Sequence, residues 1–243
     1  MGQVLVVTSG KGGTGKTTLC AGIASSLAKR GQQVLCIDAD IGLRNLDIAL
    51  GMSDTATVSF IDVIEGRCAL EDAPRHRAMT GLALLTAPVS AGDAACEGFD
   101  RLLRQARLLF DWVLIDAPAG IGSGFELATA FADRALVVSG ADPASLRDAG
   151  RAAQLLRPTV RQIHLVVNRI SRRLFRQIGA TVDDMMDQIG LPLLGLVPED
   201  PNVVLAAVSG MSLVQYTARG AAVAVDHIAR RLMDEKVALM RIR

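Results

Sequence analysis

One stretch of this sequence has the residue types and spacing of a phosphate-binding loop. Residues 10–18 read GKGGTGKTT and fit the pattern G-x-x-x-x-G-K-S/T. Glycines let the backbone turn tightly and bring its N–H groups up to phosphate oxygens. The lysine supplies a charge to the terminal phosphates, and the hydroxyl after it suits Mg²⁺. The sequence therefore predicts a nucleotide site formed by Gly12, Gly13, Thr14, Gly15, Lys16, Thr17 and Thr18, with Thr17 as a ligand of Mg²⁺.

The use of lysine singles out a second residue in this loop. The chain has 26 basic residues, but only Lys11, Lys16, Lys29 and Lys236 are lysines. Two of them lie within the loop, where a compact ammonium differs from a planar guanidinium. Because the general pattern does not require Lys11, that residue calls for an explanation of its own.

A phosphate loop must follow a strand and open a helix, and the flanking sequence predicts both. An apolar run over residues 3–8 precedes the loop, and apolar residues recur every fourth position after it. The alternative, a glycine-rich turn without a ligand, is weaker in that setting. Further apolar runs predict strands at 34–38, 82–86, 112–116, 135–139, 163–168 and 193–197. Helices are expected at 58–64, 99–109, 124–132, 143–156, 181–189 and 221–243.

Alternation of near-continuous apolar strands with helices predicts the fold class. We expect an α/β protein with a doubly wound, mostly parallel sheet and helices on both faces, the architecture of P-loop NTPases. No linker, internal repeat or low-complexity tract divides the chain, so residues 1–243 are expected to form a single domain. In such sheets, ligands bind at the carboxyl ends of the strands.

Carboxylates follow two of the predicted strands at that edge. Asp38 and Asp40 close the second strand, and Asp116 closes the strand that starts at Trp112. A carboxylate there can hold the metal directly or through water, so Asp38 and Asp116 are candidate metal ligands. Asp116 before Ala-Pro also suits a helix cap or turn. Asp40 is a candidate catalytic residue that orients water, with a surface turn as its alternative.

Composition excludes several other classes. A net charge of +1 provides no broad positive field that would attract nucleic acid. Aromatic residues make up only 3% of the chain, so few side chains could stack on bases. The four cysteines lack a C-x-x-C pair, so a zinc site or disulfide framework is unsupported, and the three histidines are isolated. With no long apolar run and a strand expected from residue 3, we predict no signal peptide and a cytoplasmic location.

Residues 11–18 resemble the deviant Walker A box of the MinD/ParA family of ATPases. Further similar stretches are DIGLRNLD at 40–47, DAPAGIGSG at 116–124, FADRALVV at 131–138, and residues 145–148 and 197–200. The resemblance implies ATP and Mg²⁺ as cofactors, and a chain that is monomeric with ADP and forms a homodimer with ATP. It also implies a role in placing the division septum, with MinC-like and MinE-like partners.

The same resemblance implies roles for single residues. Lys11 corresponds to the signature lysine, which reaches the phosphates bound by the partner subunit. Lys16 and Asp40 complete the catalytic set, Asp40 belonging to the first switch and Asp116 to the second. The adenine is expected to lie against Asn168, Pro198, Glu199 and Asp200. Residues 68–98 carry no motif that we can interpret.

Three related classes share the loop and are weighed against this interpretation. A regulator of flagellar number has the same loop and switches. A ParA-type partition ATPase binds DNA, and the candidate cluster for it is Arg169, Arg172, Arg173 and Arg176, which a solvated helix face explains equally well. Nitrogenase iron protein needs a cysteine soon after the second switch, and residues 120–132 contain none.

The C-terminal segment departs most from the family pattern, which usually ends in a linker and a basic amphipathic helix. Residues 221–243 are expected to form one helix that packs on the domain through Val225, Ile228 and Leu232. Its last turns mix basic and apolar residues, as a helix at a lipid interface would. We therefore expect weak, ATP-dependent association with the inner membrane surface, or a docked terminal helix without it.

Overall fold

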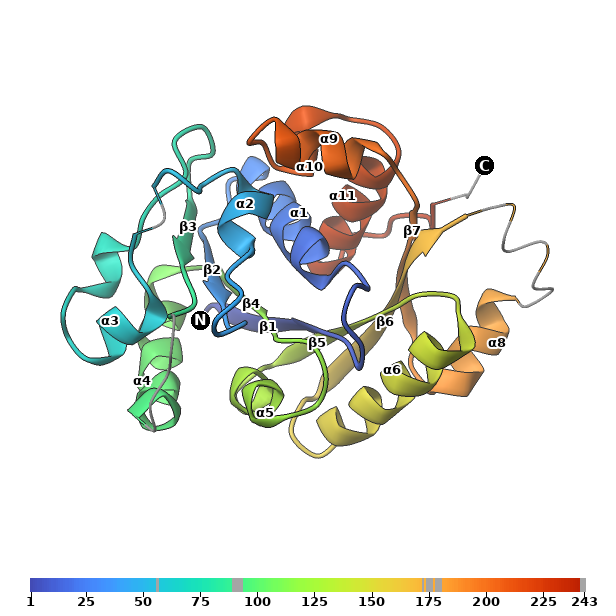
Figure 1. Ribbon diagram of the computed structural model, residues 1–243, viewed down its shortest axis with the longest axis horizontal. Helices are drawn as coiled ribbons and strands as arrows, with labels where there is room; N and C mark the ends of the chain where they lie inside the picture. Colours follow the sequence, from blue (N-terminus) through green and yellow to red (C-terminus); the bar gives the residue numbers. More distant parts are fainter. Residues whose placement is uncertain (56, 89–93, 172, 174–176, 178–180, 241–243) are drawn as a thin grey trace.

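The computed structural model describes residues 1–55, 57–88, 94–171, 173, 177 and 181–240. Within them, seven strands form one sheet in the order β3-β2-β4-β1-β5-β6-β7, and each neighbouring pair is parallel (Figure 1). Their bounds are β1 Gln3–Thr8, β2 Val34–Asp38, β3 Leu82–Leu85, β4 Trp112–Asp116, β5 Arg134–Ser139, β6 Gln162–Ile170 and β7 Leu193–Pro198. The predicted strands and the parallel sheet are confirmed.

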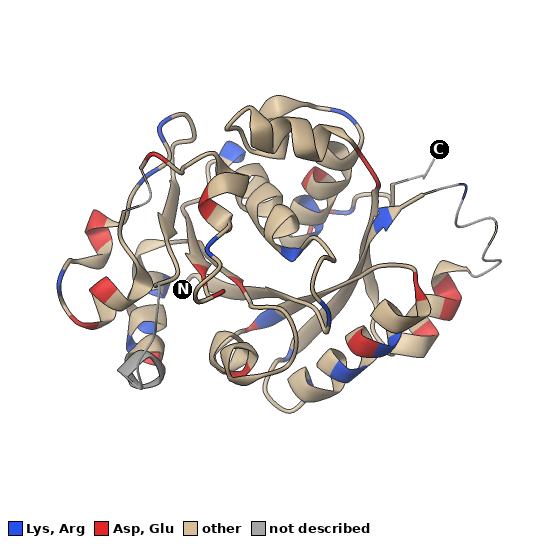
Figure 2. Cartoon of the chain, viewed as in Figure 1, with Lys and Arg blue, Asp and Glu red and all other residues tan. Residues whose placement is uncertain are grey.

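Helices cover both faces of the sheet, as predicted. One face carries α1 Lys16–Lys29, α2 Leu46–Leu50, α9 Asn202–Val208, α10 Leu213–Tyr216 and α11 Ala221–Leu232 (Figure 1). The other carries α3 Phe60–Ile64, α4 Ala94–Leu109, α5 Ser123–Thr129, α6 Pro143–Leu156 and α8 Val182–Ile189. A single 3-10 turn, η1, spans Leu70–Asp72 in the described chain. Basic and acidic residues are interspersed over these helices (Figure 2).

Two apolar cores, one on each face, explain why the strands are apolar throughout. In β1, Val4 and Val6 belong to the core beneath α4, α5 and α6. Leu5 and Val7 point the other way, into the core beneath α1 and α11. Because alternate residues of a strand face opposite sides, a strand buried on both faces needs apolar residues at every position.

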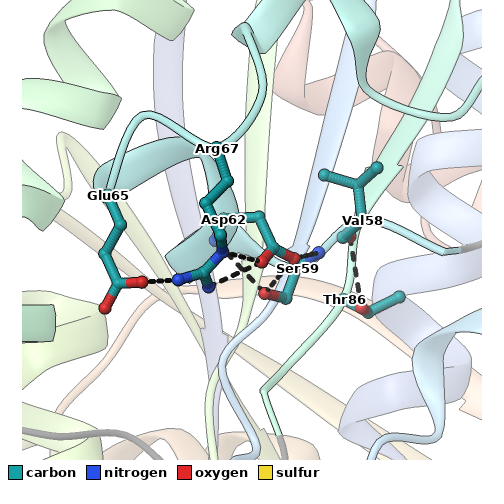
Figure 3. Close-up of polar contacts among 6 residues, drawn as sticks. All are labelled: Val58, Ser59, Asp62, Glu65, Arg67 and Thr86. Atoms are coloured by element: carbon teal, nitrogen blue, oxygen red, sulfur yellow. Dashed lines mark hydrogen bonds and ion pairs between the residues drawn. The ribbon is translucent and has the colours of Figure 1, made fainter.

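Helix α3 is fixed by a polar network at its start. The Ser59 hydroxyl accepts a hydrogen bond from the Asp62 N–H, and the Asp62 carboxylate accepts one from the Ser59 N–H at 2.8 Å. Arg67 forms ion pairs with Asp62 and Glu65 (Figure 3). The helix predicted from residue 58 therefore begins at Phe60, because Ser59 takes the extended backbone of a cap.

The prediction of one helix over 221–243 was wrong at its end. Helix α11 stops at Leu232, and Asp234 has a left-handed φ of 62°. Asp234 and Glu235 lie at the negative end of the helix dipole, where acidic residues are unfavourable. Arg231 holds the following segment by donating from Nε to the carbonyl of Val237 at 3.0 Å. The segment 233–240 therefore packs back on the domain, and 241–243 lie outside the described residues.

Candidate active site: the loop between β1 and α1

Left-handed backbone positions shape the predicted phosphate loop, which joins the carboxyl end of β1 to α1. Gly13 has a φ of 77° and Gly15 a φ of 90°, in the region that residues with a Cβ rarely adopt. A Cβ on Gly15 would also lie 2.3 Å from the Asn168 amide nitrogen. The loop therefore requires glycine at position 15 for its backbone and for its packing.

Two residues at the carboxyl end of β6 hold the loop in place. The Asn168 amide donates to the carbonyl oxygen of Thr14 at 2.8 Å, and both residues are buried. Arg169 has a left-handed φ of 56°, donates to the Gly13 carbonyl at 3.4 Å and pairs with Glu199 at 3.5 Å. Neither the loop pattern nor the family resemblance includes Arg169, so its place in this site was not predicted from sequence.

A cavity of about 820 Å³ joins the loop to the segment 198–200. Its polar end contains Lys16, Thr17 and Asp40, and its apolar end contains Val197 and Leu213. The structure thus brings together residues that the sequence analysis placed at the phosphates and at the adenine: Gly12, Gly13, Gly15, Lys16, Thr17, Thr18, Asn168, Pro198, Glu199 and Asp200. A charged end and an apolar end in one cleft match the two ends of a nucleotide.

Asp116 lies behind the loop with one acceptor unused. Its side chain is 1% exposed, and its Oδ1 has no hydrogen-bond partner among the described residues. Burial raises the pKa of this carboxyl to about 7, although a hydrogen bond from Thr17 and the charge of Lys16 lower it. An orphaned carboxylate oxygen beside the Thr17 hydroxyl fits the ligand chemistry of Mg²⁺.

Asp38 is the register neighbour of Asp116 but is placed differently. Its carboxylate accepts three backbone N–H groups, from Asp40 at 3.0 Å and from Asn45 and Leu46 at 3.1 Å each. These bonds lower the pKa that burial raises. Asp38 therefore orders the loop between β2 and α2, and its assignment as a metal ligand stays a prediction.

Lys16 and Asp40 influence each other across the cavity. Burial lowers the pKa of the Lys16 ammonium, and the charges of Asp116 and Asp40 oppose that effect. Burial raises the pKa of Asp40, and the charge of Lys16 lowers it. Asp40 thus lies on the phosphate side of the cavity, where a water-orienting carboxylate is expected.

Lys11 faces away from this cavity. It lines a neighbouring cavity of about 480 Å³, together with Asp142 and Ser145. The Lys11 ammonium is half-exposed and lies 3.8 Å from Asp142 Oδ1. Asp142 caps α6 by accepting the Ser145 N–H at 3.0 Å. The Asp-Pro pair at 142–143 is typical of such a cap and could have identified Asp142 from sequence.

Comparison with known proteins places this site in a family. The CobQ/CobB/MinD/ParA nucleotide binding domain matches residues 5–214. The septum site-determining protein MinD of Bacillus subtilis is 36% identical, covering 98% of this chain and 92% of that protein. A structure of the MinC:MinD cell division protein complex of Aquifex aeolicus has a TM-score of 0.90 at 37% identity, covering 98% of each chain. The chain belongs to the MinD family.

Membership of the MinD family confirms several expectations. The resemblance, the P-loop fold, the ATPase class and ATP with Mg²⁺ as cofactors all agree with it. MinD of Pyrococcus horikoshii, solved as a complex with Mg-ADP, has a TM-score of 0.84 at 26% identity and covers 96% of this chain. A ParA family ATPase from Chlorobium tepidum is 22% identical and shares the fold.

A MinD-type site needs few protein ligands for its metal. Among the residues that the structure describes, no three His, Cys, Asp or Glu side chains gather into a metal cage. Mg²⁺ usually keeps several waters and takes further ligands from substrate phosphates. Thr17 and Asp116 would therefore suffice as protein ligands, and their assignment to the metal stays a prediction.

Of the four arginines considered for DNA binding, the structure describes two, and these two lie in different environments. Arg169 contacts the phosphate loop, as described above, and Arg173 is exposed. Arg172 and Arg176 lie outside the described residues.

None of the helices that the structure describes combines the length and apolar character needed to cross a bilayer.

Proposed function

We propose that this chain is an ATP-driven switch of the MinD type that dimerises on ATP and helps to place the division septum. The position of Lys11 carries the proposal. Lys11 belongs to the phosphate loop, yet it lines an adjoining cavity beside Asp142 and does not line the nucleotide cavity of its own chain. A lysine so placed can contact phosphates bound by a second copy that docks on this face.

The roles of the remaining site residues follow from their positions. Lys16 neutralises the terminal phosphates, and Thr17 with Asp116 holds Mg²⁺, which when bound offsets phosphate charge. Asp38 is expected to contact the metal through water at most, because both its oxygens accept backbone hydrogen bonds. Asp40 orients the attacking water.

The adenine contacts are proposed for the other end of the nucleotide cavity. Asn168 and the segment 198–200 line that end, beside Val197 and Leu213. Apolar side chains can pack on the base, and the side-chain oxygen of Asn168 can accept a hydrogen bond from it. The same residue holds the loop through Thr14, so it couples the base to the phosphates.

Partners are proposed from the family. The Aquifex aeolicus relative was solved as a MinC:MinD complex, which supports a MinC-like partner for this chain. A MinE-like partner and peripheral association with the inner membrane surface remain proposals from the resemblance. Regulation of flagellar number and DNA partition are not favoured, since the MinD proteins reported above are 36% and 37% identical to this chain, whereas the ParA family ATPase is 22% identical.

Two substitutions test the proposal together. Asp40→Ala is expected to leave ATP binding and dimerisation intact but to slow hydrolysis about 100-fold or more, because it removes a group that acts on water. Lys11→Ala is expected to slow hydrolysis through the interface, with Lys236→Ala as the matched control. Phosphate release and light scattering with ATP or ADP measure both effects.

Mixing the two variants decides whether Lys11 acts on its own chain or on its partner. In a mixed dimer, the Lys11→Ala chain keeps Asp40 and receives Lys11 from the Asp40→Ala chain. One site is then complete, so hydrolysis reappears in the mixture. If Lys11 acts within its own chain, both sites lack a group and the mixture stays inactive, which would refute the dimeric site.

A further inference from the structure

A second polar cavity opens at the opposite edge of the sheet from the nucleotide site. It has a volume of about 400 Å³ and lies where β5, β6 and β7 begin. The charged and titratable side chains that line it are Arg134, Arg161, His164, Arg231 and Asp234. None of these residues has a part in the proposed ATPase cycle.

The lining of this cavity carries more positive than negative charge. Three guanidinium groups face one carboxylate among the lining residues, which leaves a formal charge of +2. The Arg134 side chain is 12% exposed, and its closest acid, Asp234, lies 3.9 Å away with its side chain 85% exposed. The Arg134 guanidinium also lies over the Trp112 ring at 5.7 Å. One exposed carboxylate therefore serves three guanidinium groups, so the charge of the lining is only partly compensated.

Backbone carbonyls position two of the arginines without neutralising them. Arg134 donates to the carbonyl of Leu232 at 2.8 Å, and Arg231 donates to the carbonyls of Val237 and Leu194. These bonds fix both guanidinium groups and leave some of their N–H groups unused. Arg161 is exposed and makes no hydrogen bond or ion pair with the residues that the structure describes.

His164 adds a titratable ring to the same cavity. It pairs in register with Leu136, so it shares a sheet face with Arg134, two residues earlier on β5. Its Nδ1 is buried and has no hydrogen-bond partner in the described chain. Burial, together with the charge of Arg134, lowers the pKa of the imidazole. Because His164 lines the cavity, its ring signal reports on a ligand bound beside Arg134.

We propose that this cavity binds a small dianion of the phosphate class, held by Arg134, Arg161 and Arg231. A dianion matches the formal charge of the lining. Arginine forks suit phosphate oxygens, and charge-assisted hydrogen bonds to them are among the strongest that proteins make. Free phosphate and the phosphomonoester headgroup of phosphatidic acid both present this chemistry, so the experiment has one arm for each.

Nuclear magnetic resonance of the histidine rings can observe this site directly. The chain has three histidines, His76, His164 and His227, so few ring signals need to be assigned. With the nucleotide site filled by Mg-ADP, inorganic phosphate is expected to shift the His164 signal in a saturable manner. His76, which contacts the Leu50 carbonyl on α2, serves as the internal reference.

Two substitutions should move the phosphate affinity in opposite directions. Arg161→Gln removes an exposed charge and is expected to weaken binding about tenfold. Asp234→Asn removes the competing carboxylate and is expected to tighten binding about threefold. Asparagine tolerates the left-handed backbone of residue 234, so the fold is kept. Arg104→Gln, on the exposed surface of α4, is the matched control and should change nothing.

Lipid vesicles provide the second arm. If sedimentation with phosphatidic acid vesicles falls in Arg161→Gln while phosphatidylcholine binding stays absent, the cavity also takes a lipid headgroup. A phosphate shift without vesicle binding assigns it to a free anion. An unchanged His164 signal at millimolar phosphate, or equal effects of Arg161→Gln and Arg104→Gln, would overturn the proposal. Because Mg-ADP stays bound throughout, that failure is independent of the ATPase assignment.

Discussion

Asp116→Asn is expected to stabilise the nucleotide-free protein at pH 8 while removing its magnesium-dependent hydrolysis. The carboxyl is 1% exposed and its Oδ1 lacks a partner, so the folded chain must hold a poorly solvated charge when Asp116 ionises. Its pKa is raised from 3.8 to about 7, mainly by that burial. An amide of the same shape carries no charge and avoids this cost.

The size and sign of the effect follow from proton linkage. The folded protein binds the Asp116 proton more tightly than the unfolded chain does, so this group stabilises the fold fully below pH 3.8. That contribution is lost as the pH rises towards 7 and stays lost above it. Each pH unit of this window corresponds to about 1.4 kcal/mol, which gives a difference on the order of 4 kcal/mol.

Chemical unfolding from pH 3.5 to 8, compared between the wild-type chain and Asp116→Asn, measures this difference. The free energy of unfolding of the wild-type chain should fall relative to the variant until about pH 7. Adding Mg-ADP should recover stability in the wild-type chain, since a metal ion favours the ionised carboxylate. It should recover less in the variant, which keeps the phosphate loop but lacks the anionic ligand.

Asp38→Asn is the matched comparison. The Asp38 carboxylate accepts hydrogen bonds from three backbone N–H groups, and the side-chain NH₂ group of asparagine cannot accept a hydrogen bond. This variant should therefore be destabilised by about 1–3 kcal/mol at every pH. Stabilisation by Asp116→Asn together with destabilisation by Asp38→Asn would support the conclusion that Asp116 holds an uncompensated charge and that Asp38 orders a loop. If Asp116→Asn is no more stable than the wild-type chain at pH 8, burial of an uncompensated charge is not what sets its pKa.

Three further expectations test the loop and the tail. Lys16→Ala should abolish ATP binding, and calorimetry showing affinity within about threefold, roughly 0.7 kcal/mol, would contradict the phosphate-loop assignment. Asn168→Ala should weaken ATP binding about tenfold, because the buried Thr14 carbonyl loses its donor, whereas unchanged affinity would leave that anchor without function. Liposome sedimentation should show association through residues 233–243 that is weak and requires ATP and acidic lipid, as one short segment binds lipid marginally without avidity. Strong ATP-independent binding to neutral vesicles would refute this.

The elements that the sequence predicted well are those with a strong and sustained pattern. All seven strands were found because burial on both faces makes them continuous apolar runs. Helices α2, α9 and α10 were missed, whereas α3 and α5, which are equally short, were predicted; one or two turns leave a helical period at the limit of recognition. The end of α11 was missed because its apolar spacing continues past Leu232, while the backbone turns at Asp234.

Site residues were predictable where chemistry is written in a local pattern, and less so where it depends on contacts across the chain. The phosphate loop was found by its spacing. Asp38 and Asp116 look alike in sequence, as each closes an apolar strand, and only their hydrogen-bond partners separate them. Arg169 supports the loop from a strand more than 150 residues later, which no local pattern indicates.

The ion pair between Lys11 and Asp142 is compatible with a lysine that must change partners. The two side chains are 48% and 52% exposed, with the charged atoms 3.8 Å apart. Exposed pairs of this kind stabilise a protein by about 1 kcal/mol at most, so releasing Lys11 costs little. The phosphates of a second subunit offer a stronger and less hydrated countercharge. Asp142 keeps its hydrogen bonds to Ser145 at the start of α6 after the lysine leaves, so the exchange need not disturb the helix.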